Sequence, residues 1–200
     1  MFTEGDETVK IELNAESFAQ HFLLKKYSGE NPASFCCKYQ QYSNFLTDSA
    51  GVFQEKHLST TYIAVNRLNG DIVAYMSLAT SSALVSSKDK KSLGIEIKPM
   101  DNIPAIKVTQ LAVDQLYAQR YKNVGKNMIF FARMLACRCS EIAACSILTV
   151  DADVETNLGV DQFYEKCGFQ RLKREISQKR KRIGNDVALK TIPMWSPLFI

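Results

Sequence analysis

Long apolar runs are missing from this sequence, and glycine, proline and histidine are scarce. The longest purely apolar runs span only a few residues, whereas a helix that crosses a membrane needs about 20. No basic-then-apolar leader of the kind that directs export opens the chain. Nine glycines and five prolines in 200 residues exclude a collagen-like or low-complexity chain. We therefore expect a cytoplasmic protein with no membrane partner and a single domain, residues 1–200.

Spacings typical of metal sites and of disulfide frameworks are missing as well. The sequence has two histidines, and its six cysteines include one adjacent pair, Cys36 and Cys37, but no C-x-x-C motif. We expect no metal site and reduced thiols. Because no histidine lies near the cysteine pair in the sequence, we expect both thiols to be packing residues rather than nucleophiles.

What is present is the composition of a folded domain, with 46% hydrophobic and 23% charged residues. Apolar spacings of three and four predict helices over residues 14–27, 38–57, 126–143 and 157–166. Alternating or β-branched runs predict strands over residues 9–13, 60–66, 71–78, 103–113 and 146–150, with another from Phe169. Asn69-Gly70 predicts a hairpin between the second and third of these strands. Residues 81–102 are polar and predict a long loop with one short strand near residues 94–97.

Residues 120–126, with the sequence RYKNVGK, lie between a predicted strand and a predicted helix. Free backbone N–H groups and the positive end of a helix dipole meet at such a point, and together they favour an anion. This segment is therefore a candidate phosphate site. It lacks the glycine spacing of a nucleotide P-loop or a dinucleotide fingerprint, so an ordinary strand-to-helix turn is the alternative.

Positive charge is concentrated near the C-terminal end. Residues 171–182 hold seven lysines and arginines against one acid, Glu175. The alternation around Leu172 and Ile176, followed by the turn signal at residues 184–186, predicts a hairpin with its basic residues at the tip. The densest charge is carried by four candidate nucleic-acid contacts, Lys179, Arg180, Lys181 and Arg182. A solvated surface is the alternative.

Residues 157–169, with the sequence NLGVDQFYEKCGF, resemble the N-x-x-A-x-x-F-Y-x-K-x-G-F segment of GCN5-related N-acetyltransferases, the GNAT superfamily. The superfamily also has a strand ending in L-A-V-D and a pyrophosphate loop of the form Q/R-x-x-G-x-G/A, which residues 111–114 and 120–125 are similar to. Asn123 replaces the first glycine of that loop, and the link before it is about two residues longer. Asparagine tolerates the left-handed backbone that the glycine provides. The resemblance implies an α/β fold with a mixed, mostly antiparallel sheet flanked by helices and splayed at the acetyl-CoA site.

The N-terminal half and one strand near the C-terminal end resemble one subgroup, the GNAT toxins of bacterial toxin-antitoxin pairs. The similarity lies in Phe35-x-Cys37, Phe45-Leu46, Ala50, Thr61-Tyr62 and a closing strand at residues 191–194. Together with the motifs above it covers residues 35–198. This subgroup implies the α-amino group of aminoacyl-tRNA as the acceptor and a ribbon-helix-helix antitoxin as a partner, and it leaves a homodimer open.

The resemblance implies roles for particular residues. Backbone groups of Leu111, Ala112 and Val113 would bind the acetyl-CoA arm, and Asn157 would hydrogen-bond it. The pyrophosphate would lie on Arg120, Tyr121, Lys122, Asn123, Val124, Gly125 and Lys126. Tyr164 would give a proton to the leaving thiolate, because a phenol is ordinarily protonated at neutral pH. Glu96 is considered as a base, with a solvated carboxylate as the alternative, and the general base is left unassigned.

Three functions follow for comparison. The first is acetyl-CoA-dependent acetylation of a primary amine, with aminoacyl-tRNA as the acceptor that the toxin resemblance implies. The second is acetylation of a small molecule or a protein amine. The third is a non-catalytic module that binds CoA or a partner, which the loss of the glycine raises and the presence of Tyr164 and Asn157 argues against.

Overall fold

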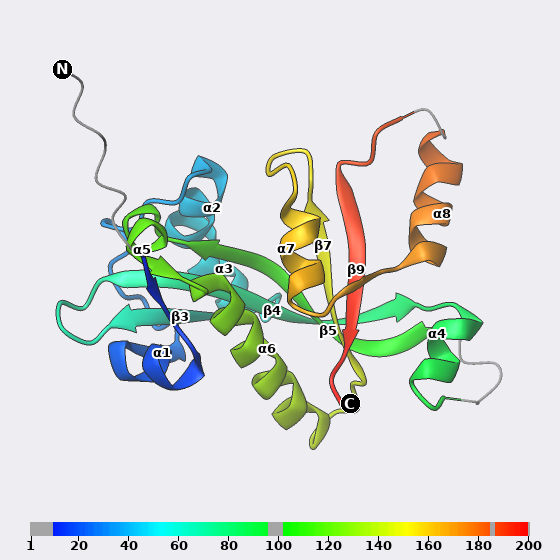
Figure 1. Cartoon of the computed structure of the whole chain (residues 1–200), viewed down its shortest axis with the longest axis horizontal. Coiled ribbons are helices and arrows are strands. Elements are labelled where there is room, and N and C mark those ends of the chain that lie inside the picture. Colours follow the sequence, from blue (N-terminus) through cyan, green and yellow to red (C-terminus); the bar gives the residue numbers. More distant parts are fainter. Residues whose placement is uncertain (1–9, 96–101, 185–186, 200) are drawn as a thin grey trace. The chain divides into compact units, whose positions relative to one another are not determined.

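The computed structural model describes residues 10–95, 102–184 and 187–199. In this described part, seven strands form one sheet with the order β2-β3-β4-β5-β7-β9-β8 (Figure 1). The pairing of β5 with β7 is parallel, whereas β2–β3, β7–β9 and β8–β9 are antiparallel. A mixed sheet with helices around it confirms the fold class expected from the GNAT resemblance.

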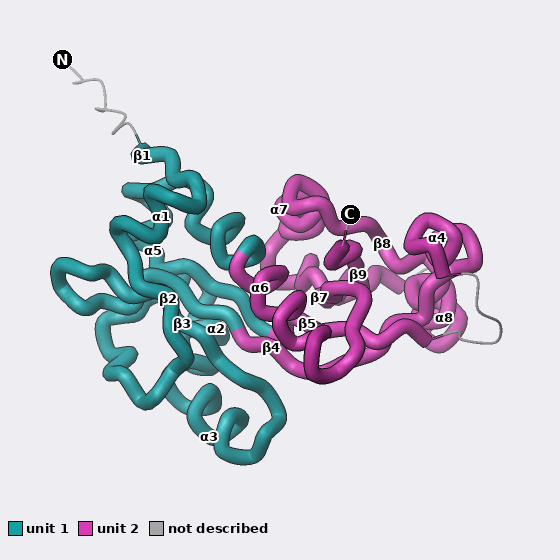
Figure 2. The backbone as a smooth tube through the Cα atoms, turned by 90° about the horizontal axis from the view of Figure 1, so that it is seen from below, with its two compact units in different colours: residues 1–76, 110–130 teal, residues 77–109, 131–200 magenta. Residues whose placement is uncertain are grey.

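The chain divides into two compact units, residues 1–76 with 110–130 and residues 77–109 with 131–200 (Figure 2). The first unit contains β1 (Ile11–Glu12), α1 (Ala15–His21), β2 (Phe22–Lys26), α2 (Gln40–Asn44), η1 (Phe45–Ser49), α3 (Ala50–Glu55), β3 (Thr60–Asn66), α5 (Gln115–Arg120) and β6 (Tyr121–Lys122). The second contains α4 (Ser87–Ser92), β7 (Ile147–Asp153), α7 (Val160–Lys166), β8 (Gln170–Arg171), α8 (Lys173–Ile183) and β9 (Thr191–Pro197). The chain passes from one unit to the other within β4 (Ile72–Leu84), β5 (Asn102–Val113) and α6 (Val124–Ser140). A single domain stays a prediction.

The first predicted helix is much shorter than residues 14–27. Asn14 caps α1 as expected, because its side chain accepts from the backbone N–H of Ser17 at 2.8 Å. The helix ends at His21, and the chain continues as β2, paired antiparallel with β3 from Phe22 opposite Asn66. Phe22 is 1% exposed, so the strand buries the apolar residue that the helical spacing had assigned to a helix face.

The predicted helix over residues 38–57 is divided into α2, the π-helical turn η1 and α3. Its apolar face packs as expected, since Leu46 and Ala50 are fully buried with Tyr75 in the core of the first unit. Phe45 stacks on the Tyr75 ring with centroids 5.9 Å apart. Ala112, one of the predicted cofactor-binding residues, belongs to the same core.

The connection from β5 to α6 was predicted as a link and a basic loop, and that prediction is wrong. Residues 115–120 form the helix α5, which Asp114 caps with hydrogen bonds from the Leu116 and Tyr117 amides. Tyr121 and Lys122 form β6, which pairs in parallel with β1. Only Asn123 separates β6 from α6. A side-chain cap and a strand partner about 110 residues away in the chain therefore order this connection.

The core of the second unit lies around Trp195, which is 1% exposed and packs with Ile103, Ile147 and Leu172. β9 contains the predicted closing strand and pairs with β7 along its whole length. The long loop predicted after residue 81 is wrong, because β4 runs to Leu84 and Ser86 caps α4. Gly94 and Ile95 lie outside any strand, and the other two residues of that predicted strand, Glu96 and Ile97, lie outside the described residues.

The basic segment forms the helix α8, so the predicted basic hairpin tip is wrong. The four-residue spacing of Leu172 and Ile176 is helical, and the Ile176 amide donates to the Leu172 carbonyl at 2.9 Å.

No helix in the described part of the chain is long and apolar enough to cross a membrane.

Candidate functional site

The predicted acetyl-CoA strand is the end of β5. Ala112 is 4% exposed, and Leu111 and Val113 are half-buried. In the described part, the parallel pairing of β5 with β7 ends at Val108 and Val150, while β7 continues to Asp153 beside β9. An end to the pairing at this point is what the expected splay requires.

The cysteine pair lies against this strand end, within the first unit. The Cys36 amide donates to the Asp114 carboxylate at 2.8 Å, and the Gln115 amide donates to the Cys36 carbonyl at 2.8 Å. Burial raises the pKa of the Cys37 thiol, and hydrogen bonds with backbone groups including Val113 offset only part of that rise. The Cys37 thiol is therefore neutral at neutral pH, and its half-buried position agrees with the predicted packing role. Cys36 is exposed, so the packing role predicted for it is wrong.

The predicted phosphate segment is centred on Asn123. Its φ is +68°, in the left-handed region that the glycine of the GNAT loop would occupy. Its carbonyl accepts the first helical hydrogen bond of α6 from the Asn127 amide at 2.9 Å. The first turn of the 17-residue helix α6 begins with Val124, Gly125 and Lys126. The backbone N–H groups of a first turn have no acceptor within their own helix. The left-handed turn and the start of the helix are therefore present although the glycine is missing, and the phosphate site stays a prediction.

Three cationic residues lie within three positions of Asn123 in the sequence. Arg120, Lys122 and Lys126 are all exposed, and the Arg120 guanidinium lies 5.5 Å from the centroid of the Tyr121 ring. Tyr121 itself is 7% exposed, so its side chain is part of the packing beneath the turn. Arg120 is the last residue of α5, Lys122 the last residue of β6, and Lys126 lies in the first turn of α6.

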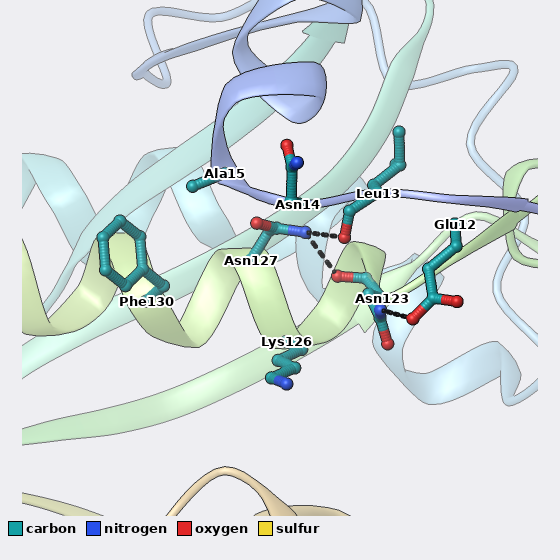
Figure 3. A pocket seen from close by; sticks show the side chains of 8 residues that line it. All are labelled: Glu12, Leu13, Asn14, Ala15, Asn123, Lys126, Asn127 and Phe130. Carbon is teal, nitrogen blue, oxygen red and sulfur yellow. Dashed lines mark hydrogen bonds between the residues drawn. The ribbon is translucent and has the colours of Figure 1, made fainter.

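A pocket of about 500 Å³ lies beside the turn (Figure 3). It is lined by Glu12, Leu13, Asn14, Ala15, Asn123, Lys126, Asn127 and Phe130. Asn123 and Lys126 were predicted from the sequence, whereas the N-terminal residues and Asn127 were missed. No motif signals Glu12, because its contact with Asn123 joins residues 111 positions apart.

Tyr164 lies on α7, in the second unit. Its side chain is 7% exposed and forms an edge contact with the Phe169 ring at 5.5 Å. The Tyr164 carbonyl accepts from the Phe169 amide at 3.0 Å across the left-handed Gly168, which ends the helix as predicted. This hydrogen bond caps the C-terminal end of α7, the helix that carries Tyr164.

The same helix end is attached to α6 within the second unit. Arg133 donates to the Cys167 carbonyl at 2.6 Å and to the Pro197 carbonyl at 2.9 Å, and its guanidinium lies over the Phe169 ring. The sequence interpretation missed Arg133, which lies in the apolar stretch of α6. It ties α7 and β9 to one helix.

Asn157 precedes α7 rather than starting it. The helix begins at Val160 after the left-handed Gly159, so the predicted start at residue 157 is wrong. The Asn157 amide donates to the Asp153 carbonyl at 3.1 Å, and its carbonyl accepts from the Val160 amide at 3.1 Å. The half-buried Asn157 is thus held in a turn between β7 and α7.

The basic helix α8 has two faces. On the face toward the sheet, Lys179 lies 3.5 Å from Asp151 and 3.1 Å from the Thr191 hydroxyl, and Glu175 accepts from the Leu84 amide at 2.9 Å. Burial raises the pKa of the Asp151 carboxyl, but Lys107 at 2.6 Å and Lys179 outweigh it, and the net direction is down. Asp151 is therefore a carboxylate at neutral pH and anchors the helix.

The other face of α8 is exposed and positive. Lys173 and Arg180 are seven residues apart, which places them on one helix face, and Lys181 is adjacent to it. All three are exposed. Of the four predicted nucleic-acid contacts, Arg180 and Lys181 are on this outer face, Lys179 is tied to Asp151, and Arg182 lines a pocket with Glu175.

All six cysteines are free thiols. Within residues 10–95, 102–184 and 187–199, no group of three or more histidine, cysteine, aspartate and glutamate side chains is arranged to hold a metal ion.

Comparison with solved structures identifies the fold. A phenylalanine-for-tyrosine variant of KacT is 16% identical, with a TM-score of 0.69 over 90% of this chain and 96% of that one. AtaT complexed with acetyl-methionyl-tRNAfMet is 18% identical, with a TM-score of 0.67 over 88% and 94%. AtaTR bound with acetyl-CoA is 18% identical, with a TM-score of 0.65 over 90% and 95%.

The chain has the fold of KacT and AtaT. No protein-family model matches it, and no curated protein matches it either. The likeness to KacT and AtaT extends over nearly their whole length.

Proposed function

We propose that this protein is an acetyl-CoA-dependent N-acetyltransferase. The observation that carries the proposal is the turn into α6, where Asn123 adopts a φ of +68° without a glycine. In a GNAT fold this turn presents the amides that a pyrophosphate needs, and three exposed cationic residues lie within three positions of Asn123 in the sequence. The bound acetyl-CoA of AtaTR supports the same cosubstrate for this chain.

Each step of acetyl transfer has a candidate group among the residues described above, except removal of the proton from the amine. Acetyl transfer to an amine needs an amine without its proton, a polarised thioester carbonyl and a proton for the leaving thiolate. Backbone groups of Leu111–Val113 would orient the acyl arm and stabilise the carbonyl oxygen, and Asn157 would hydrogen-bond the arm. Tyr164 would donate its phenolic proton to the sulfur. The general base remains unassigned.

We infer that the acceptor is the α-amino group of aminoacyl-tRNA. The complex of AtaT with acetyl-methionyl-tRNAfMet supports this acceptor class. In this chain, α8 adds an outer face of exposed lysine and arginine that is anchored to the sheet through Lys179 and Asp151. A fixed basic face suits the phosphates of an RNA backbone.

An antitoxin is the proposed protein partner. AtaT has been solved bound to the C-terminus of the antitoxin AtaR, and the toxin resemblance implies a ribbon-helix-helix protein in that role. Co-purification with the product of an adjacent gene tests this partner. A homodimer stays a prediction.

The function is tested by two measurements on the full chain. Calorimetry with acetyl-CoA should show binding, and mass spectrometry should show one acetyl group gained by charged tRNA, with uncharged tRNA as the control. Acetyl transfer only to small amines or peptides would favour the second function considered above. Binding of acetyl-CoA without transfer to any amine would indicate a non-catalytic module.

A further inference from the structure

The N-terminal segment runs alongside the phosphate turn. β1 pairs in parallel with β6, with Ile11 opposite Tyr121 and Glu12 opposite Lys122. The pairing continues one residue further, because the Leu13 amide donates to the Lys122 carbonyl at 3.3 Å. Leu13 is 2% exposed, so this short strand is fixed to the first unit by a buried side chain as well as by its backbone.

Side chains from both segments meet at Asn123 (Figure 3). The Asn123 side-chain amide donates to the Glu12 carboxylate at 3.0 Å. The Asn127 side-chain amide donates to the Leu13 carbonyl at 3.3 Å and to the Asn123 carbonyl at 2.9 Å. Asn123 is therefore held through its side chain by Glu12 and through its backbone by α6.

This arrangement bears on the residue that departs from the GNAT loop pattern. A glycine would enter the left-handed region freely but would offer no side chain to hold. Asparagine is strained there, although less than most residues. The Asn123 side chain makes the left-handed conformation less favourable than it would be for glycine. The same side chain donates the hydrogen bond to Glu12 that holds Asn123 in that conformation.

We propose that Glu12 is a positioning residue of the phosphate turn. Resting on the proposed function, the inference is that the Glu12–Asn123 hydrogen bond keeps Asn123 left-handed and so aims the amides of Val124, Gly125 and Lys126 at the cofactor pyrophosphate. The N-terminal segment is then a built part of the cofactor site. Its carboxylate acts through Asn123 and does not itself contact the anion.

Two substitutions at one position separate support from charge. Glu12→Ala removes both the acceptor and the negative charge, whereas Glu12→Gln removes the charge and keeps an oxygen that accepts from Asn123. Positioning predicts about fivefold weaker binding of acetyl-CoA by Glu12→Ala, with binding by Glu12→Gln at least as tight as in the wild type. A purely electrostatic effect predicts tighter binding by both variants and would overturn the proposal.

A second substitution, at Asn123, tests whether Glu12 acts through that residue. Asn123→Gly adopts the left-handed turn without help, so adding Glu12→Ala to it should change affinity less than twofold, and the two changes should be non-additive. Full additivity would count against the proposal. Circular dichroism and thermal melting of each variant show that it is folded, and an unchanged kcat with a raised KM for acetyl-CoA is the kinetic sign of positioning.

Calorimetry with inorganic pyrophosphate distinguishes this inference from the proposed function. If the wild type binds pyrophosphate in a Glu12-dependent manner but does not bind acetyl-CoA, the acetyltransferase proposal fails and the positioning role stands. Binding of acetyl-CoA that is the same in wild type and Glu12→Ala leaves the acetyltransferase proposal in place and overturns the role of Glu12. Binding of neither compound by the wild type overturns both.

Discussion

At the scale of single residues, Tyr164 is the most direct test of catalysis. Its ring packs on Phe169 and its side chain is 7% exposed, so Tyr164→Phe keeps the packing and removes only the hydroxyl. Loss of a general acid should lower kcat for acetyl transfer about a hundredfold or more, with little change in acetyl-CoA affinity.

Tyr117→Phe is the matched control for that experiment. The Tyr117 hydroxyl contacts Asn66 at 2.8 Å and Asp71 at 3.1 Å in the β3–β4 hairpin, so its loss should leave kcat unchanged. Wild-type turnover by Tyr164→Phe would make Tyr164 a packing residue.

Gly125 tests the cofactor turn. It lies in the first turn of α6, where a carboxylate would occupy the position of the anion and repel it. Gly125→Glu should therefore abolish acetyl-CoA binding measured by calorimetry. Met134→Glu places the same charge on an exposed position of the same helix, where Met134 is 44% exposed, and should bind normally. Unchanged affinity in folded Gly125→Glu would remove the cofactor from this turn.

Glu30 gives the fold a pH dependence away from the candidate site. Burial raises the pKa of its carboxyl, but Lys25 at 2.7 Å and two donors from Ser28 outweigh burial and lower the pKa from 4.5 to about 2. A carboxyl with a lowered pKa stabilises the folded state above the unfolded value near 4.5, and this stabilisation is lost as the pH falls toward 2.

Glu30→Gln should therefore lower the free energy of unfolding by about 1 kcal/mol at pH 7, and the difference from wild type should vanish in acid. Urea unfolding across a pH series measures it. Glu141→Gln, on an exposed turn after α6, serves as the control. A difference that stays constant down to pH 2 would contradict the assigned contacts.

At the scale of secondary structure elements, α8 provides the test of an RNA acceptor. Changing Lys173, Arg180 and Lys181 to Gln removes three positive charges from the outer face and leaves the Lys179–Asp151 contact in place. Acetylation of charged tRNA should fall at moderate salt, and the salt dependence of binding should flatten by up to about one unit of slope per lost phosphate contact.

The internal control is basal hydrolysis of acetyl-CoA by the same variant, which should be unchanged because the cofactor turn is not altered. Equal activity of variant and wild type on aminoacyl-tRNA across the salt series would exclude this face of α8 as the binding surface.

The errors of the sequence interpretation also belong to the element scale. Local spacing predicted the helix face of residues 38–57 and the long strand β5, because both bury residues at regular intervals. It failed for residues 22–26, whose helical spacing yields to antiparallel pairing with β3. It failed for α8, where two apolar residues four apart were taken as strand alternation among charges. Pairing partners distant in sequence decide such segments, and local patterns do not contain them.

Only the residues of the candidate site that belong to sequence motifs could be predicted. Asn123 could be interpreted as a left-handed substitute for glycine, and Tyr164 and Gly168 follow from one short segment. Glu12 and Arg133 could not be predicted, since neither belongs to a motif and each acts through a contact with a distant segment. Motifs in the sequence therefore point to the groups proposed to contact the cofactor, but not to the residues that support those groups.

At the scale of the whole molecule, Trp195 makes the relation between the two units measurable. It is the only tryptophan of the chain, and it is 1% exposed in the core of the second unit. Its fluorescence therefore reports solvent entry into that unit alone, whereas far-ultraviolet circular dichroism reports helices and strands of both. For a single cooperative domain, the two urea transitions should coincide. Two separated midpoints would instead mean that the chain unfolds in two steps, with the intrinsic fluorophore marking which unit opens first.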